Sequence, residues 1–113
     1  MNVVFHVSSG TLSEVSHATN NVRNLLRDET TDSESVTLLA NGDSVYFFTA
    51  DSPIADYVES LIEAGVRCRV CRNSITGRDI AADELVDGIE LVPSGVGELV
   101  KRQAAGDAYL KVP

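Results

Sequence analysis

Two cysteines near the middle of the chain have the side chains best suited to chemistry. Cys68 and Cys71 form a Cys-x-x-Cys sequence, a spacing typical of thiol–disulfide exchange. They lie, however, in the β-branched run 66–71, which predicts a strand. Residues three apart in a strand are separated by about 10 Å and point to opposite faces, whereas a disulfide requires Cα atoms within about 7 Å. We therefore predict no disulfide, with Cys68 in the core beside Val66 and Val70.

Cys71 stands at the end of this predicted strand, where the chain continues as Arg72, Asn73 and Ser74. A helix start at this point would direct backbone N–H groups at the sulfur, and nearby arginines would add positive charge. Both favour the thiolate and lower a cysteine pKa from its ordinary value of about 8.5. From the residues alone, Cys71 is either a reactive thiolate or a buried structural thiol. Arginines are concentrated around this strand: Arg67, Arg69, Arg72 and Arg78.

The ends of the other predicted strands supply further candidate site residues, because ligands of open parallel sheets bind at the carboxyl ends of strands. The segment 93–97 could present helix-start N–H groups to an anion, although it lacks the lysine of a phosphate-binding loop. The strand ends carry small or polar residues, which we take as candidate pocket or anion-binding positions: Ser8, Asn41, Gly42, Ser94 and Gly95.

The two histidines offer little further chemistry. His6 alternates with valine and phenylalanine in the first predicted strand, as a hydrogen-bonded core histidine does, and His17 lies on the outer face of the first predicted helix. Together with the two cysteines they match no zinc-ligand spacing. The acidic residues are scattered, which does not favour a paired-carboxylate enzyme. The sequence therefore predicts no metal site.

Short apolar runs alternate with amphipathic stretches along the whole chain. This pattern predicts one α/β domain over residues 1–113, with three layers and a mostly parallel sheet. A capping box at Thr11 and Glu14 marks the first helix, and Ser52 followed by Pro53 is expected to cap and begin the second. The strands are expected at 2–7, 36–40, 66–71, 89–92 and 108–112, and the helices at 12–26, 53–64, 80–86 and 96–105, with a short helical stretch after Ser74.

The segment 41–49 has two interpretations. Asn41 and Gly42 stand between two apolar runs, a pattern typical of a β-hairpin because both residues tolerate positive φ. Residues 45–48 would then pair antiparallel with the preceding strand. In the other interpretation the strand ends at Gly42 and residues 44–49 form a helical turn.

Composition limits the partners of the protein. The chain has 17 acidic and 9 basic residues and a net charge of −8, so nucleic acid is not expected as a partner. No apolar run reaches the roughly 20 residues that span a bilayer, and the N-terminus lacks the basic start of a signal peptide. We therefore expect a cytoplasmic protein without a membrane contact. An acidic, lysine-poor surface suits a salt-rich cytoplasm and a halophilic organism, or simply an ordinary acidic protein.

The run from Gly65 to Ile75, Gly-Val-Arg-Cys-Arg-Val-Cys-Arg-Asn-Ser-Ile, resembles the Gly-Val…Cys-x-Asn-Ser-Leu segment of the DsrE/DsrF-like family of sulfur-relay proteins. The C-terminal part strengthens the resemblance, through Val-Pro-Ser-Gly-Val at 92–96 and Ala-Tyr-Leu at 108–110, with Glu98, Gln103 and Gly106 between them. The opening Val-Phe-His-Val at 4–7 is also similar to the family, so the resemblance spans nearly the whole chain.

The resemblance implies a flavodoxin-like α/β fold assembled as a homotrimer or homohexamer. It implies that a cysteine at the position of Cys71 accepts sulfur as a persulfide and passes it to a partner protein. It also favours the helical turn after Gly42 over the hairpin. Cys68 lies outside the family motif, in agreement with its interpretation as a core residue. Arg69 and Arg72 are not part of the motif.

Our main hypothesis is therefore transfer of sulfane sulfur between a donor protein, Cys71 and an acceptor thiol. The anionic persulfide would be stabilised by the loop amides and by Arg72, without any bound cofactor; the amides are those of Asn73, Ser74, Ser94 and Gly95. The rival hypothesis is a non-catalytic oligomeric module that binds a small ligand or a protein partner at the same strand ends.

Overall fold

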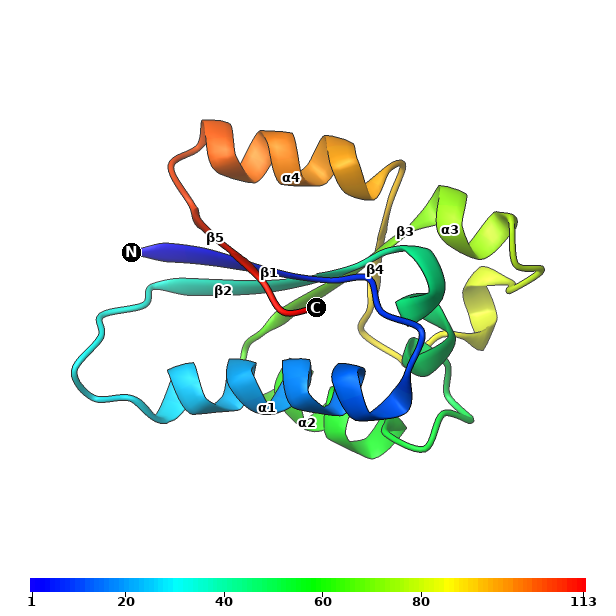
Figure 1. The fold of residues 1–113 in the computed structure, drawn as a ribbon, viewed down its shortest axis with the longest axis horizontal. Helices are drawn as coiled ribbons and strands as arrows, with labels where there is room; N and C mark the ends of the chain where they lie inside the picture. Colours follow the sequence, from blue (N-terminus) through cyan, green and yellow to red (C-terminus); the bar gives the residue numbers. More distant parts are fainter.

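Five parallel strands form a single sheet in the order β4-β3-β2-β1-β5 in the computed structural model, which describes residues 1–113 (Figure 1). The order places β1 and β2 at the centre, as expected for the most continuously apolar runs of the sequence. The strands are β1 (Asn2–Val7), β2 (Ser35–Ala40), β3 (Arg67–Cys71), β4 (Glu90–Val92) and β5 (Ala108–Lys111).

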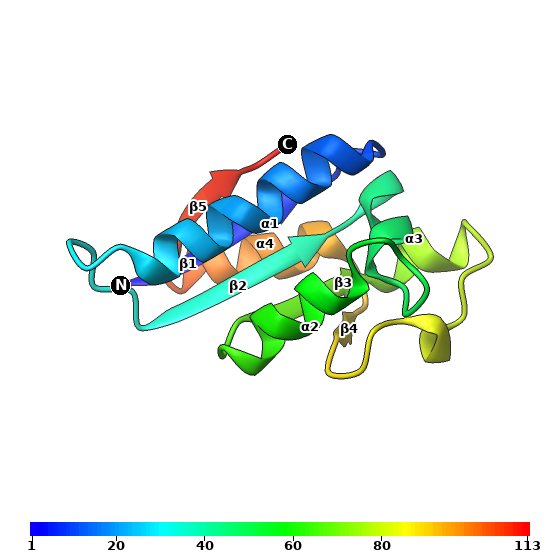
Figure 2. The ribbon, with the colours of Figure 1, turned by 90° about the horizontal axis from the view of Figure 1, so that it is seen from below.

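Helices cover both faces of this sheet, which confirms the predicted three-layer α/β fold. Helices α1 (Leu12–Arg27) and α2 (Ala55–Glu63) lie on one face, and α4 (Gly95–Ala104) lies alone on the other (Figure 1). Seen from below, α1 and α2 run side by side beneath the strands (Figure 2). Three short helical segments complete the chain. The 3₁₀ helix η1 (Gly42–Phe48) follows β2, α3 (Arg72–Thr76) follows β3, and the 3₁₀ helix η2 (Ala82–Glu84) lies between α3 and β4.

The alternation of side chains along each strand divides the core between the two faces. The larger cluster of buried side chains, with Val3, Phe5 and Val7 of β1, packs against α1 and α2. A smaller cluster lies under α4 and consists of Val4, Leu39, Val92 and Leu99. Odd and even positions of one strand therefore serve different layers.

The first helix begins where the sequence predicts. The Thr11 hydroxyl accepts a hydrogen bond from the Glu14 N–H at 3.4 Å. The Glu14 carboxylate accepts bonds from the Thr11 and Ser9 hydroxyls instead of the Thr11 N–H, so only half of the capping box forms. These hydroxyl bonds lower the pKa of Glu14.

The segment after β2 is helical, as the family resemblance implies, and forms no hairpin. Gly42 adopts φ of 59° and begins η1. The Ser44 hydroxyl donates to the backbone oxygens of Val7 at 3.0 Å and of Asn41 at 2.7 Å. These bonds tie the start of η1 to the end of β1, which a hairpin would not allow.

The expected start of the second helix is wrong. Helix α2 begins at Ala55 with Ile54 at its cap position, not at Ser52 and Pro53. The Ser52 hydroxyl accepts from the Ile54 N–H at 3.2 Å and the Ser52 carbonyl from the Ala55 N–H at 3.1 Å, so these residues close a turn before the helix.

The expected helix over 80–86 is also wrong, because only the three residues of η2 are helical. Leu85 pairs antiparallel with Thr49, and the Val86 N–H donates to the Phe48 carbonyl at 3.0 Å. A helix of seven residues over 80–86 would be too short to be stable alone. Leu85 and Val86 are instead buried against the end of η1.

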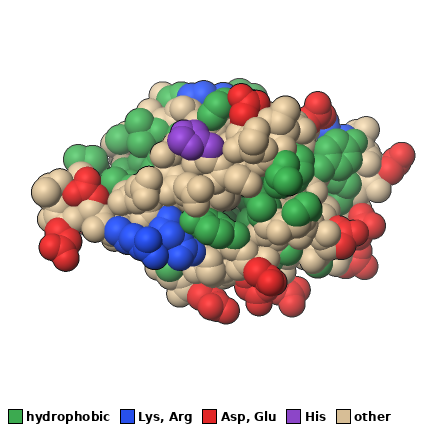
Figure 3. Space-filling view, turned by 60° about the horizontal axis from the view of Figure 1, so that its bottom comes forward, with side chains coloured by type: hydrophobic (Ala, Val, Ile, Leu, Met, Phe, Trp, Pro, Cys, Tyr) green, Lys and Arg blue, Asp and Glu red, His purple; other side chains and the backbone are tan.

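The surface agrees with the acidic composition. On the face covered by α1 and α2, acidic side chains gather toward the right-hand end of the view, whereas the basic side chains lie mostly in one patch toward the left (Figure 3). The net charge of −8 disfavours binding to phosphate backbones. No helix combines the length and the apolar composition that crossing a membrane requires.

Candidate thiol site at the carboxyl ends of the strands

The two cysteines lie on opposite faces of β3, as the two-residue period of a strand predicts. Cys68 is 1% exposed and belongs to the larger core cluster together with Val66 and Val70. Cys71 is 5% exposed, lies outside that cluster and ends the strand next to Gly95 of α4. Both thiols are free. The Cys-x-x-Cys sequence is therefore no disulfide motif in this fold.

The surroundings of Cys71 favour its thiolate. Burial raises the pKa of the Cys71 thiol, but hydrogen bonds to the sulfur from the Ser74 hydroxyl and from the N–H groups of Gly95, Ser74 and Asn73 outweigh it. The net result is a pKa below the ordinary value. Burial alone acts on Cys68 and raises its pKa to about 12. Of the two cysteines, Cys71 is therefore the one whose surroundings favour the thiolate.

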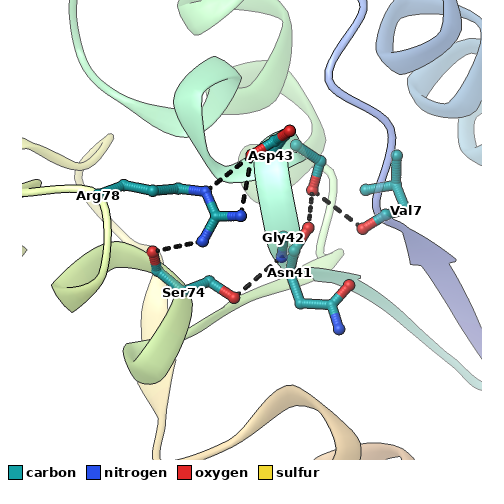
Figure 4. Close-up of polar contacts among 7 residues, drawn as sticks. Val7, Asn41, Gly42, Asp43, Ser74 and Arg78 are labelled. Carbon is teal, nitrogen blue, oxygen red and sulfur yellow. Dashed lines mark hydrogen bonds and ion pairs between the residues drawn. The ribbon is translucent and has the colours of Figure 1, made fainter.

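A network in the neighbouring loops holds Ser74 in place (Figure 4). The Gly42 N–H donates to Ser74 Oγ at 2.9 Å, and Arg78 Nη1 donates to the Ser74 carbonyl at 3.0 Å. Arg78 is itself fixed by Asp43, at 3.0 Å from Nε and 2.8 Å from Nη2. Because Ser74 Oγ already accepts from Gly42, its own O–H is left to donate to the Cys71 sulfur. Sequence reasoning missed the pairing of Asp43 with Arg78.

Gly95 lets the start of α4 approach the thiol closely. A Cβ atom at this position would lie 3.1 Å from the Asn41 Cβ and 3.4 Å from the Cys71 Cβ. The missing side chain therefore brings the ends of β2, β3 and the first turn of α4 together. The Gly95 N–H reaches the sulfur through this contact.

A group of partly buried charges holds α4 on the sheet. Arg69 of β3 donates to the Glu98 carboxylate, and Arg102 Nε lies 3.6 Å from Glu98 Oε2. Arg69 also lies 3.9 Å from the exposed Glu90 carboxylate. Arg69 precedes Cys71 by two residues on the same face of the strand, and Glu98 follows Gly95 by three, so this ion pair fixes the helix start beside the thiol.

The arginines around β3 do not form one positive cluster. Arg69 and Arg78 are paired with carboxylates. Arg67 and Arg72 are exposed, and neither side chain forms a hydrogen bond or an ion pair. In this structure the Cys71 pKa depends on hydrogen bonds, and Arg72 is not among its causes.

The remaining candidate residues divide into two groups. Asn73, Ser74 and Gly95 meet at the sulfur. The Ser94 hydroxyl instead caps α4, accepting from the Gly97 N–H at 2.8 Å, and the Ser8 hydroxyl accepts from Lys111 Nζ at 2.9 Å.

Asn41 and Gly42 border the site, but no surface hollow includes them, Ser8 or Cys71. One surface hollow, with a volume of about 480 Å³, lies away from the thiol and is lined by residues that include Tyr46, Asp51 and Asp79.

His6 is a site neighbour that sequence reasoning assigned to the core. It is half-buried, and its Nε2 and Nδ1 atoms lie 2.8 Å from Asn41 Oδ1 and 2.7 Å from the Tyr109 hydroxyl. Burial lowers the pKa of His6, Asn41 raises it and the Lys111 charge lowers it, with a net lowering. The position of His6 in the strand could have revealed this. Two residues after Val4, its side chain points to the same face of the sheet, near the end of β1, where it contacts Asn41.

Replacing Ser74 by alanine is expected to raise the pKa of Cys71 by about one to two pH units. A hydrogen bond to a charged group is worth roughly 1.5–3 kcal/mol, and about 1.4 kcal/mol corresponds to one pH unit. The pH dependence of iodoacetamide alkylation, followed by intact mass, measures this pKa. Ser74→Thr keeps the hydroxyl and should titrate like the wild type; an unchanged midpoint in Ser74→Ala would contradict the assignment.

Comparison with known proteins agrees with this fold. The family model described as DsrE/DsrF-like family matches residues 1–112. The solved structure of MTH1491 from Methanobacterium thermoautotrophicum, a protein of unknown function, is 34% identical, with 97% of each chain covered and a TM-score of 0.90. No curated protein matches the chain at a significant level.

More distant structures share the fold alone. The ychN protein from E. coli is 18% identical over 98% of this chain and 99% of its own, with a TM-score of 0.78. BT1422 from Bacteroides thetaiotaomicron, a conserved protein of unknown function, is 13% identical over 97% and 93%, with a TM-score of 0.73. A family match over nearly every residue, together with a near-complete structural match at 34% identity, shows that the chain belongs to the DsrE/DsrF-like family.

Proposed function

We propose that this protein carries sulfane sulfur as a persulfide on Cys71 and passes it to the thiol of a partner protein. The family is associated with sulfur relay, and one observation on this chain carries the proposal. Of its two cysteines, one is buried with a pKa of about 12, whereas the other is surrounded by hydrogen-bond donors that lower its pKa. A thiolate held in this way is the nucleophile that sulfur exchange requires.

The reaction is an exchange that balances without any cofactor. The Cys71 thiolate attacks the outer sulfur of a donor persulfide, R–S–SH. A new S–S bond forms to Cys71, the S–S bond of the donor breaks, and R–S⁻ leaves with the electron pair. In the second step an acceptor thiolate attacks the outer sulfur of Cys71–S–SH, and the Cys71 thiolate leaves. Sulfur moves in both steps, with no net oxidation or reduction.

The residues of the site stabilise the Cys71 thiolate both when it attacks in the first step and when it leaves in the second. The Ser74 hydroxyl and the N–H groups of Asn73, Ser74 and Gly95 hold negative charge on the Cys71 sulfur. They thereby increase the fraction of attacking thiolate in the first step and stabilise the leaving thiolate in the second. Arg72, exposed beside the site, is available to a negatively charged partner surface or to the persulfide.

Proteins of this family are generally oligomeric, and we propose a homotrimer or a homohexamer for this chain.

A second candidate function uses the same assembly without sulfur chemistry. Cys71 is only 5% exposed and lines no hollow, which favours a structural role for the thiol; the strand ends would then bind a protein partner or a small ligand without its chemistry. Thiol chemistry separates the two candidates.

The test is intact-mass spectrometry after exposure of the protein to a sulfane-sulfur donor. The wild type and Cys68→Ala are expected to gain about 32 Da, one sulfur atom, which a reductant removes. Cys71→Ser is expected to gain nothing. Alanine is preferred at position 68 because a serine hydroxyl would be buried there. Absence of the adduct in the folded wild type would reject the carrier and favour the binding module.

A further inference from the structure

A chain of hydrogen bonds crosses the sheet from its edge toward the thiol site. Tyr109 of the edge strand β5 contacts His6 of β1, and His6 contacts Asn41 at the end of β2, at 2.7 and 2.8 Å. The rings of Tyr109 and His6 lie 5.8 Å apart between centroids. The site described above uses none of these three side chains, although they end next to it.

The chemistry of the partners fixes the direction of each bond. Asn41 Oδ1 can only accept, so His6 Nε2 must donate to it. Burial is the main cause of a lowered His6 pKa, so the imidazole is neutral at physiological pH and has one N–H. That proton is on Nε2, and the Tyr109 hydroxyl therefore donates to Nδ1. The Asn41 amide is thus held with its oxygen toward His6.

The amide nitrogen of Asn41 faces the thiol site. It lies 3.4 Å from the point where a Cβ atom of Gly95 would stand, and the Cys71 Cβ lies 3.4 Å from that same point. Asn41 Nδ2 donates to no acceptor of the protein, while its loop neighbours are all engaged (Figure 4). A free N–H₂ group is therefore oriented beside Cys71.

We propose that His6 is a positioning residue of the thiol site: it holds the Asn41 amide so that its N–H₂ group hydrogen-bonds to the outer sulfur of the Cys71 persulfide. The inference deepens the proposed function and rests on it. The outer sulfur would lie one S–S bond, about 2 Å, beyond the Cys71 sulfur. The donors already assigned to Cys71 serve the inner sulfur, and Asn41 is the free donor for the outer one. Such a bond stabilises the anionic persulfide.

The experiment installs the persulfide chemically, so that it does not depend on a natural donor. In a Cys68→Ala background, Cys71 is converted to its mixed disulfide with 5-thio-2-nitrobenzoate. Hydrosulfide then attacks the Cys71 sulfur, a new S–S bond forms, and the aromatic thiolate leaves with the electron pair of the old one. The pH midpoint for alkylation of the outer sulfur by iodoacetamide, read by intact mass, reports the stability of the anion.

Three variants separate positioning from a structural role. His6→Leu and Asn41→Leu are expected to raise the midpoint by about one to two pH units, the value of one lost bond to a charged group. His6→Gln keeps an N–H donor toward Asn41 and should restore the wild-type midpoint. A His6→Leu variant that melts at a lower temperature but keeps the midpoint would overturn the proposal, because His6 would then only join the strands.

The outcomes also separate this inference from the carrier function. If hydrosulfide cannot convert the mixed disulfide of the folded Cys68→Ala protein into a persulfide, the positioning role is overturned, since no space for the outer sulfur would exist. A Cys68→Ala protein that holds the installed persulfide with a His6-dependent midpoint, yet takes no sulfur from a donor, would reject the carrier function and retain the role of His6.

Discussion

At neutral pH, iodoacetamide is expected to alkylate Cys71 at least about thirty times faster than Cys68 in the folded protein, because a roughly thousandfold larger thiolate fraction outweighs the greater intrinsic nucleophilicity of the more basic thiolate. The thiolate is the reacting form, and its fraction falls tenfold for each pH unit by which the pKa exceeds the pH. The pKa of Cys68 is raised by burial to about 12, whereas that of Cys71 lies below its ordinary value. The difference in exposure, 5% against 1%, acts in the same direction.

Peptide mapping of the protein after timed alkylation measures both rates in one sample. Alkylation in concentrated guanidinium chloride is the control, because both cysteines are then exposed and should react at similar rates. Equal rates in the folded protein would mean that Cys71 is as inert as a core thiol. That result would remove the main support for sulfur exchange at this position.

The Glu98→Ala substitution is expected to lower the free energy of unfolding by about 3 kcal/mol or more. The Glu98 and Arg69 side chains are only 10% and 14% exposed. Removing one partner of a buried ion pair leaves an uncompensated charge, which typically costs about 3–5 kcal/mol. Arg102 of α4 would lose its partner at the same time, so two guanidinium groups would be left without the Glu98 carboxylate.

Urea unfolding followed by circular dichroism measures this loss, and Glu90→Ala provides the matched control. Glu90 also faces Arg69, but its side chain is 60% exposed, so its removal should cost less than about 1 kcal/mol. A Glu98→Ala variant no less stable than Glu90→Ala would show that the pair under α4 is screened by solvent.

The positions of the strands could be predicted because burial on both faces leaves a clear sequence pattern. Parallel strands in the centre of a sheet are apolar at nearly every position, as Val3, Val4 and Phe5 are. The two-residue period of a strand also predicts from the sequence alone that Cys68 and Cys71 point to opposite faces. The placement of Asn73 and Ser74 at the sulfur followed from the expected helix start after the strand.

Other features depend on contacts that a sequence does not display. Asn41 and Gly42 fit a hairpin or a helical turn equally well, and the bond from Ser44 to the Val7 carbonyl decides between them. His6 reaches partners 35 and 103 residues away. In both cases the local residue types allow several structures, and tertiary hydrogen bonds select one.

The position of the two cysteines on opposite faces of β3 has a consequence for how the thiol is regenerated. Cys68 cannot act as a resolving cysteine, because the sheet itself separates it from the Cys71 sulfur. Any sulfenic acid or persulfide formed on Cys71 therefore needs a thiol from another molecule for its reduction. Turnover of the protein should then be bimolecular, with a rate proportional to the concentration of that external thiol. Without it, an oxidant would drive Cys71 irreversibly to the sulfinic acid.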